Sequence, residues 1–69
     1  MDNNLQETFN FPQIDRVIKR EGKNSESLIQ ILHGTQEILG YLPKEAQLYI
    51  AEKLQIPPTR VYGIVSFYN

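Results

Sequence analysis

Apolar residues recur along this chain with the period of amphipathic α-helices, and glycines and prolines divide the pattern into segments. The clearest segment is 28–39, where apolar residues return every three or four positions and polar residues fill the opposite side. Asn24 or Ser25 is expected to cap this helix at its N-terminus. The face predicted to be buried carries Leu28, Ile31, Leu32, Thr35, Ile38 and Leu39.

A tight turn, Gly40-Tyr41-Leu42-Pro43, separates this helix from the next one. Gly40 can adopt the left-handed conformation that ends a helix, and Pro43 suits the first turn of a new one. A second helix is therefore predicted over 43–54, and so short a connection makes the two helices fold back on each other. Its predicted buried residues are Leu42, Ala46, Tyr49, Ile50 and Leu54.

The N-terminal part divides into a polar arm and a short helix. Residues 1–10 lack periodicity and are predicted to form a flexible arm, anchored to the body through Phe9 or Phe11. From Pro12 onward the apolar spacing predicts a helix that ends at Gly22.

The last segment, 59–68, is ambiguous. Its valine, isoleucine, tyrosine and phenylalanine content favours a strand, whereas Val61, Ile64, Val65 and Tyr68 repeat at helical spacing. A single strand without partners would not be stable in a chain this small, so we predict a helix after the break at Pro57-Pro58. The fold class is therefore all-α, a small bundle of four short helices over residues 11–69.

Composition limits the functions open to the chain. With 69 residues and 41% hydrophobic residues it can form one small domain, and 7 basic against 8 acidic residues provide no surplus for binding phosphates. No apolar run approaches the roughly 20 residues of a transmembrane helix. We expect no nucleic-acid partner and no membrane insertion, and a cytoplasmic location, either free or peripheral to a membrane complex.

The chain contains no cysteine and a single histidine, His33. It can supply neither a thiolate nucleophile nor the ligands of a zinc or iron–sulfur site. His33 and Glu37 stand one helical turn apart, which is typical of a surface pair. We predict no catalytic residue, no cofactor-binding residue and no metal ligand, and hence no enzyme activity for the chain alone.

Residues 50–64 have the outline of a helix-turn-helix, in which Ala51 would lie at the helix crossing. The supposed recognition helix offers Arg60 and Tyr62 but little else that could read bases in a groove. A small helix-turn-helix DNA-binding domain is therefore the alternative to a protein-binding domain.

The last predicted helix carries more apolar surface than one core face can use, which favours a covered surface. Gly34, in the middle of its helix, indicates either a close helix neighbour or a partner contact, and Leu48 lies among charges. The candidate partner-binding residues are Tyr62, Gly63, Ser66 and Phe67, with Leu48 and Gly34 as weaker candidates.

From about residue 28 onward the chain resembles the N-terminal helical region of the thioredoxin-like [2Fe-2S] ferredoxin subunit of NADH dehydrogenase (complex I). Related subunits occur in NAD(P)-linked hydrogenases and formate dehydrogenases. Ser66 stands where threonine is usual and Gln55 where glycine or asparagine is usual. The motifs that carry the resemblance are Leu32-His33, Gln36-Glu37, Gly40-Tyr41-Leu42-Pro43, Ile50-Ala51-Glu52, Ile56-Pro57 and Val61-Tyr62-Gly63-Ile64-Val65 leading into Ser66-Phe67-Tyr68.

The resemblance implies a helical docking domain that contacts the flavin- and NADH-binding subunit of such a complex. It also implies a downstream thioredoxin-like domain that brings four cysteines for a [2Fe-2S] cluster. Because the chain has no cysteine, we expect it to be cut before that domain and the cluster to belong to the part that follows.

Overall fold

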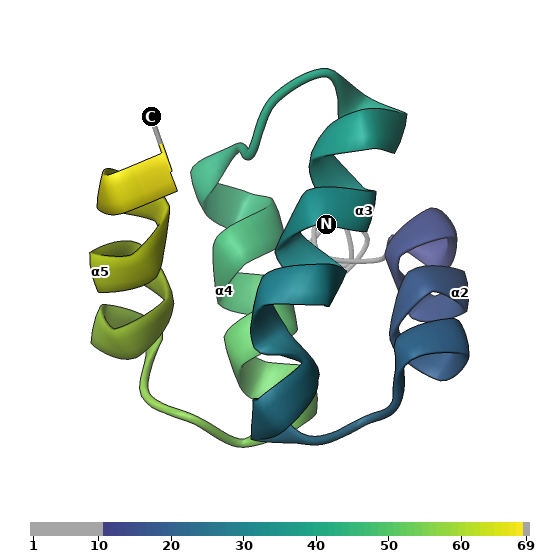
Figure 1. Cartoon of the computed structure of the whole chain (residues 1–69), viewed down its shortest axis with the longest axis horizontal. Coiled ribbons are helices and arrows are strands. Elements are labelled where there is room, and N and C mark those ends of the chain that lie inside the picture. Colours follow the sequence, from purple (N-terminus) through teal and green to yellow (C-terminus); the bar gives the residue numbers. More distant parts are fainter. Residues whose placement is uncertain (1–10, 69) are drawn as a thin grey trace, which may run out of the picture.

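The computed structural model describes residues 11–68, and this part of the chain consists of four α-helices (Figure 1). The all-α prediction is therefore confirmed. The predicted arm, residues 1–10, lies outside the described residues, as do Asn69 and the side chain of Tyr68. The helices are α2 (Pro12–Glu21), α3 (Leu28–Leu39), α4 (Lys44–Leu54) and α5 (Pro58–Tyr68), with a 3-10 turn, η1 (Ser25–Ser27), before α3.

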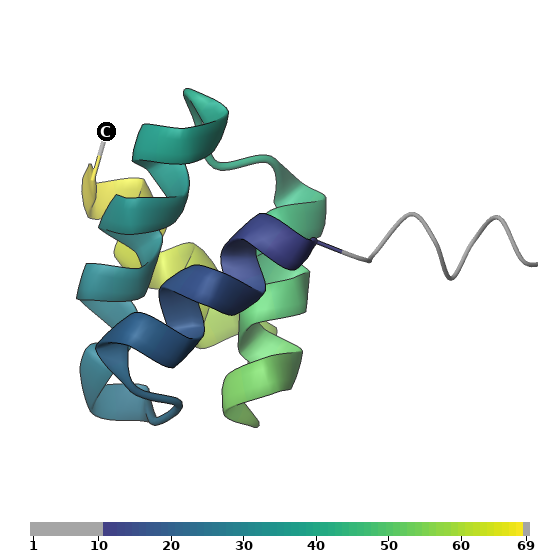
Figure 2. The same cartoon turned by 90° about the vertical axis from the view of Figure 1, so that its right-hand side faces the viewer.

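The four helices form two packed pairs, α2 with α3 and α4 with α5. Figure 2 shows α2 running diagonally across α3 and α4, whereas α5 lies on the far side. The apolar faces of all four helices meet in one core. Its buried members are Ile14, Val17, Ile18, Leu28, Ile31, Leu32, Ala46, Tyr49, Ile50, Ala51, Leu54, Val61 and Val65.

The turn between α3 and α4 forms as predicted. Gly40 is left-handed, with φ 87°, and its N–H donates to the carbonyl of Gln36 at 2.7 Å. Pro43 directly precedes α4 as its N-cap instead of lying in its first turn, because its ψ of 154° is extended. The side-chain amide of Gln47 donates to the carbonyl of Leu42 at 2.8 Å and so fixes the turn to the start of α4.

Besides the position of Pro43, two local expectations were wrong. Ile38 is 46% exposed, because it lies in the last turn of α3, which projects above the neighbouring helices in Figure 1. Neither Asn24 nor Ser25 caps α3, because the 3-10 turn η1 precedes the helix. The hydroxyl of Ser27 instead donates to the carbonyl of Glu21 at 2.8 Å and so provides a hydrogen-bond donor for the last carbonyl group of α2.

Gly34 allows α2 and α3 to approach each other closely. A Cβ atom at this position would lie 2.9 Å from Cγ1 of Val17 and 3.0 Å from a guanidinium nitrogen of Arg20. The first distance is shorter than real Cβ contacts, and Val17 is a buried, β-branched residue with little freedom to move. The packing of α2 on α3 therefore accounts for this glycine.

Tyr49 connects the two helix pairs. Its hydroxyl donates to Oδ1 of Asp15 on α2 at 2.5 Å, and its ring packs edge-to-face on Phe11, with the centroids 5.3 Å apart. Burial of the ring, followed by the hydrogen bond to Asp15, raises the pKa of Tyr49 from 10.0 to about 12. The neutral phenol is thus the form that stabilises the fold.

The close contact at Gly34 predicts the effect of adding one methyl group. Gly34→Ala should lower the free energy of unfolding by about 1 kcal/mol, because overpacking outweighs the gain in helix propensity. Urea denaturation monitored by circular dichroism measures this difference. Equal or higher stability of the variant would contradict the close contact.

The raised pKa of Tyr49 predicts a loss of stability in alkali. Because the folded pKa of about 12 exceeds the unfolded value of 10.0, the contribution is complete below pH 10 and is lost as the pH rises toward 12. At neutral pH, Tyr49→Phe should lower the free energy of unfolding by about 1 kcal/mol through the lost hydrogen bond. Urea titrations at several pH values should show this difference shrinking between pH 10 and 12; a constant difference would refute the assignment.

Candidate functional site

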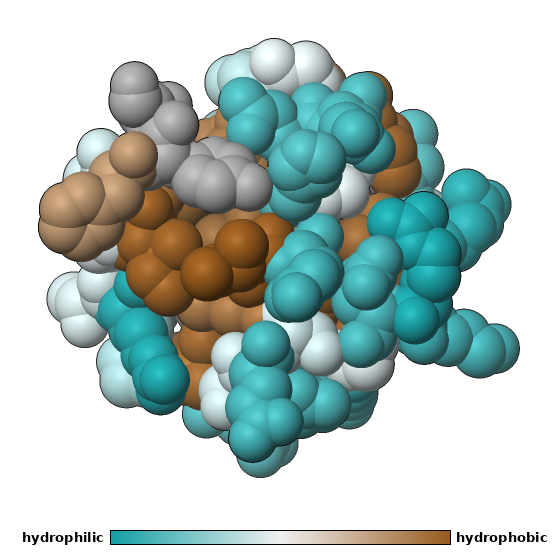
Figure 3. All heavy atoms as spheres, viewed as in Figure 1, coloured by the Kyte–Doolittle hydropathy of each residue, from teal (hydrophilic) through white to brown (hydrophobic). Residues whose placement is uncertain are grey.

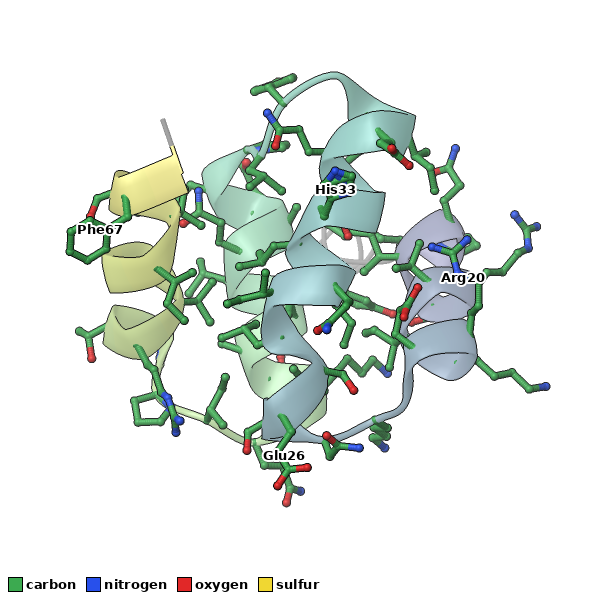
Figure 4. All side chains as sticks on the ribbon, in the orientation of Figure 1. Arg20, Glu26, His33 and Phe67 are labelled. Atoms are coloured by element: carbon green, nitrogen blue, oxygen red, sulfur yellow. The ribbon has the colours of Figure 1, made fainter. Side chains whose placement is uncertain are left out.

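Helix α5 has one face in the core and one face open to solvent. Val61 and Val65 are buried, whereas Gly63, Ser66 and Phe67 are exposed. Phe67 is 89% exposed, the highest value among the large hydrophobic side chains in the described part of the chain. Figure 4 shows its ring pointing away from the bundle, on the side opposite Arg20. This outward face of α5, from Tyr62 across Gly63 and Ser66 to Phe67, is the candidate site.

The centre of this face is smooth. A Cβ atom on Gly63 would meet nothing within 4 Å among the described residues, in contrast to Gly34. The hydroxyl of Ser66 donates a hydrogen bond to the carbonyl of Gly63 at 2.8 Å, so this donor is already satisfied within the helix. Glycine in a helix costs about 1 kcal/mol relative to alanine, and no described contact requires it at position 63.

Tyr62 and Ile64 form the two borders of this face, and both are half-buried. The ammonium group of Lys44, at the start of α4, lies 4.9 Å from the centroid of the Tyr62 ring. Ile64 packs against the core on the other border. In Figure 3, hydrophobic surface gathers between α5 and α3 on the face turned toward the viewer. The apolar area of α5 therefore continues beyond Phe67 toward α3.

The structure separates the two weaker candidates from this face. Leu48 is half-buried on α4 and lines a groove of about 410 Å³, which Tyr49, Glu52, Ile56 and Pro58 complete. Gly34 lies on the opposite side of the bundle, against α2. Four of the six predicted contact residues therefore lie on α5, and Leu48 lies on the neighbouring helix α4. Gly34 is in contact with α2 and is not open to a partner.

Sequence reasoning did not select two basic residues at the borders of this face, Lys44 and Arg60. Lys44 is the first residue of α4, and Arg60 is the third residue of α5. The signal that could have identified them is their place at the positive ends of helix dipoles, where cations are disfavoured.

The chain does not fit an iron–sulfur cluster. It has no cysteine, and residues 11–68 contain no group of three or more histidine, aspartate or glutamate side chains that could hold a metal ion. His33 and Glu37, 3.8 Å apart, are both exposed and form the surface pair that the sequence predicts. No helix in the described part is long and apolar enough to cross a membrane.

Comparison with known proteins extends these observations. The family model of thioredoxin-like [2Fe-2S] ferredoxin matches residues 14–69. The NADP-reducing hydrogenase subunit HndA of Solidesulfovibrio fructosivorans is 40% identical over 56 residues, 81% of this chain and 30% of that protein. A subunit of the NADH-quinone oxidoreductase of Aquifex aeolicus is 30% identical over 66 residues, 88% of this chain and 41% of that protein.

The chain thus spans less than half the length of these two relatives, and no solved structure gives a significant match. The family match covers α2 from Ile14 onward and all of α3, α4 and α5, and the identity to the hydrogenase subunit extends over most of the same residues. The predicted resemblance is confirmed: this chain belongs to the thioredoxin-like [2Fe-2S] ferredoxin family.

Proposed function

We propose that this chain is a non-catalytic helical docking domain of an electron-transfer subunit in an NAD(P)-linked oxidoreductase. The parent complex would be of the NADH dehydrogenase, hydrogenase or formate dehydrogenase type, and the domain would bind its flavin- and NADH-binding subunit. The two relatives are named as subunits of an NADP-reducing hydrogenase and an NADH-quinone oxidoreductase, which supports this assignment. The [2Fe-2S] cluster would lie in a thioredoxin-like domain of the parent protein, since this chain has no cysteine.

The observation that carries the proposal is the pairing of Gly63 with Phe67. An exposed aromatic ring leaves a large apolar surface in water, and such rings are enriched among residues that dominate interface energies. Gly63, one turn away, lacks a packing role in the described fold but would let another backbone approach α5 closely. Together the two residues provide an anchor beside a smooth surface, which is suited to a protein partner.

The thioredoxin-like domain of the parent protein is the second proposed partner of this part of the chain. The outward face of α5 could be covered by that domain instead of by the flavin- and NADH-binding subunit. Binding measured with the 69-residue chain alone distinguishes the two, because only the subunit is then present to cover the face.

The surface of α5 does not favour the DNA-binding alternative. Arg60 is the one charged residue of this helix, and the outward residues Gly63 and Phe67 offer no hydrogen bonds to base edges. The net charge of −1 provides no attraction for phosphates.

The docking role predicts a large effect of two changes on the outward face. Phe67→Ala should weaken binding of the chain to the cognate flavin- and NADH-binding subunit about 30-fold, as expected for loss of an interface anchor worth about 2 kcal/mol. Gly63→Arg should weaken binding at least as much by blocking close approach. Isothermal titration calorimetry measures both affinities.

Ile29→Ala is the matched control, because it removes another exposed hydrophobic side chain, on α3 beside Arg20 and Glu21 of α2. Its affinity should equal that of the unaltered chain. If Phe67→Ala and Gly63→Arg also bound with unchanged affinity, the proposed docking face would be wrong.

A smaller substitution at Gly63 should separate stability from binding. Gly63→Ala should raise the free energy of unfolding by about 0.5–1 kcal/mol, because the methyl group has space and alanine favours the helix. The same methyl group should reduce the affinity for the partner several-fold. Urea denaturation and calorimetry on the same preparation test both effects, and unchanged affinity would show that position 63 does not lie in the contact.

A further inference from the structure

The outward face of α5 is bordered by one cation on each side. Arg60 is exposed and precedes Phe67 by seven residues, so the two lie on the same side of the helix, about 10 Å apart along its axis. Lys44 lies over the ring of Tyr62, on the opposite border, with Nζ 4.9 Å from the ring centroid. The smooth strip of Gly63 and Ser66 runs between these two cations.

Both cations occupy positions that the helix dipole disfavours. Lys44 begins α4, and Arg60 lies in the first turn of α5, where the partial charge of the helix is positive. Among the other charged residues of the described helices, Glu21, Glu37 and Glu52 also lie against the dipole, in last turns, whereas five residues follow it. Asp15 and Glu45 lie in first turns, and Lys19, Arg20 and Lys53 lie in last turns.

Interactions within the described part do not compensate Arg60. The ion pair found among residues 11–68 joins Arg20 to Glu21, and the other close contact between groups that can carry opposite charges joins His33 to Glu37 at 3.8 Å. Glu45 and Glu52 on α4 form an ion pair with neither Arg60 nor Lys44, and α5 contains no acidic residue. Lys44 gains a cation–π contact with Tyr62, which directs its charge toward the α5 face.

The positive border of this face contrasts with the net negative charge of the whole chain. The chain as a whole carries a net charge of −1, yet this face is bordered by two cations and by the positive ends of two helices. A surface bordered by cations is complementary to a partner surface that carries carboxylates. Carboxylates on the partner would pair with Arg60 and would add to the cation–π contact that Lys44 already makes.

We infer that the partner surface covering α5 is apolar at its centre and carries carboxylates at two points of its rim, opposite Arg60 and Lys44. The apolar centre receives Phe67 and lies along Gly63 and Ser66. The inference rests on the proposed docking function and adds the chemistry of the partner. The carboxylates would steer association and fix the orientation of the bound domain, as rim charges do in other interfaces.

Charge reversal tests the inference. Arg60→Glu and Lys44→Glu should each weaken binding of the 69-residue chain to the cognate flavin- and NADH-binding subunit at least tenfold at low salt, measured by surface plasmon resonance. The association rate of the unaltered chain should fall as the salt concentration rises. Both substitutions place a carboxylate where the helix dipole favours it, although Lys44→Glu also removes the contact with Tyr62, so urea denaturation of each variant checks that a weaker complex does not reflect unfolding.

Arg16→Glu is the matched control, because it makes the same change in net charge at an exposed position on α2. It should bind like the unaltered chain. If Arg60→Glu and Lys44→Glu also bound like the unaltered chain while Phe67→Ala bound weakly, the acidic rim would be refuted and the docking face retained. If Phe67→Ala also bound normally, the docking face itself would be wrong, and the acidic rim with it.

Discussion

The fold depends on one apolar core that two helix pairs share. The backbones of α2 and α3 pack on each other, as do those of α4 and α5, and core side chains such as Ile31 and Ile50 fill the space where the pairs meet. Tyr49 closes one edge of this core, with its hydroxyl on Asp15 and its ring on Phe11. A chain of this size has little surplus burial, so each of these contacts contributes substantially to its stability.

Helix α5 contributes one side to this core and leaves its other side in solvent. Val61 and Val65 face inward, and the opposite side of the helix lies at the edge of the bundle with Phe67 in solvent. The two helical glycines illustrate the consequence: Gly34 is explained by its neighbour Val17, whereas a side chain at position 63 would have free space around it. The same residue type thus serves the inner packing on one side of the molecule and an open surface on the other.

The helices were predictable because their signals are local. The spacing of Ile14, Leu32 and Ile50 with their neighbours, and the turn at Gly40, determine the elements and most of the buried face. The sequence could not reveal that α3 extends past its neighbours, which exposes Ile38, or that Ser27 satisfies α2 instead of capping α3. The role of Gly34 and the positions of Lys44 and Arg60 around α5 depend on contacts between helices, which no single segment specifies.

Hydrogen exchange measured by mass spectrometry is the most direct test of the central claim that α5 is the docking helix. Amide exchange of the chain should be compared alone and bound to the cognate flavin- and NADH-binding subunit. The docking proposal predicts that binding slows exchange most in residues 58–68 and leaves α2, residues 12–21, unchanged. Slowed exchange confined to α2 and α3, with residues 58–68 unaffected, would contradict it.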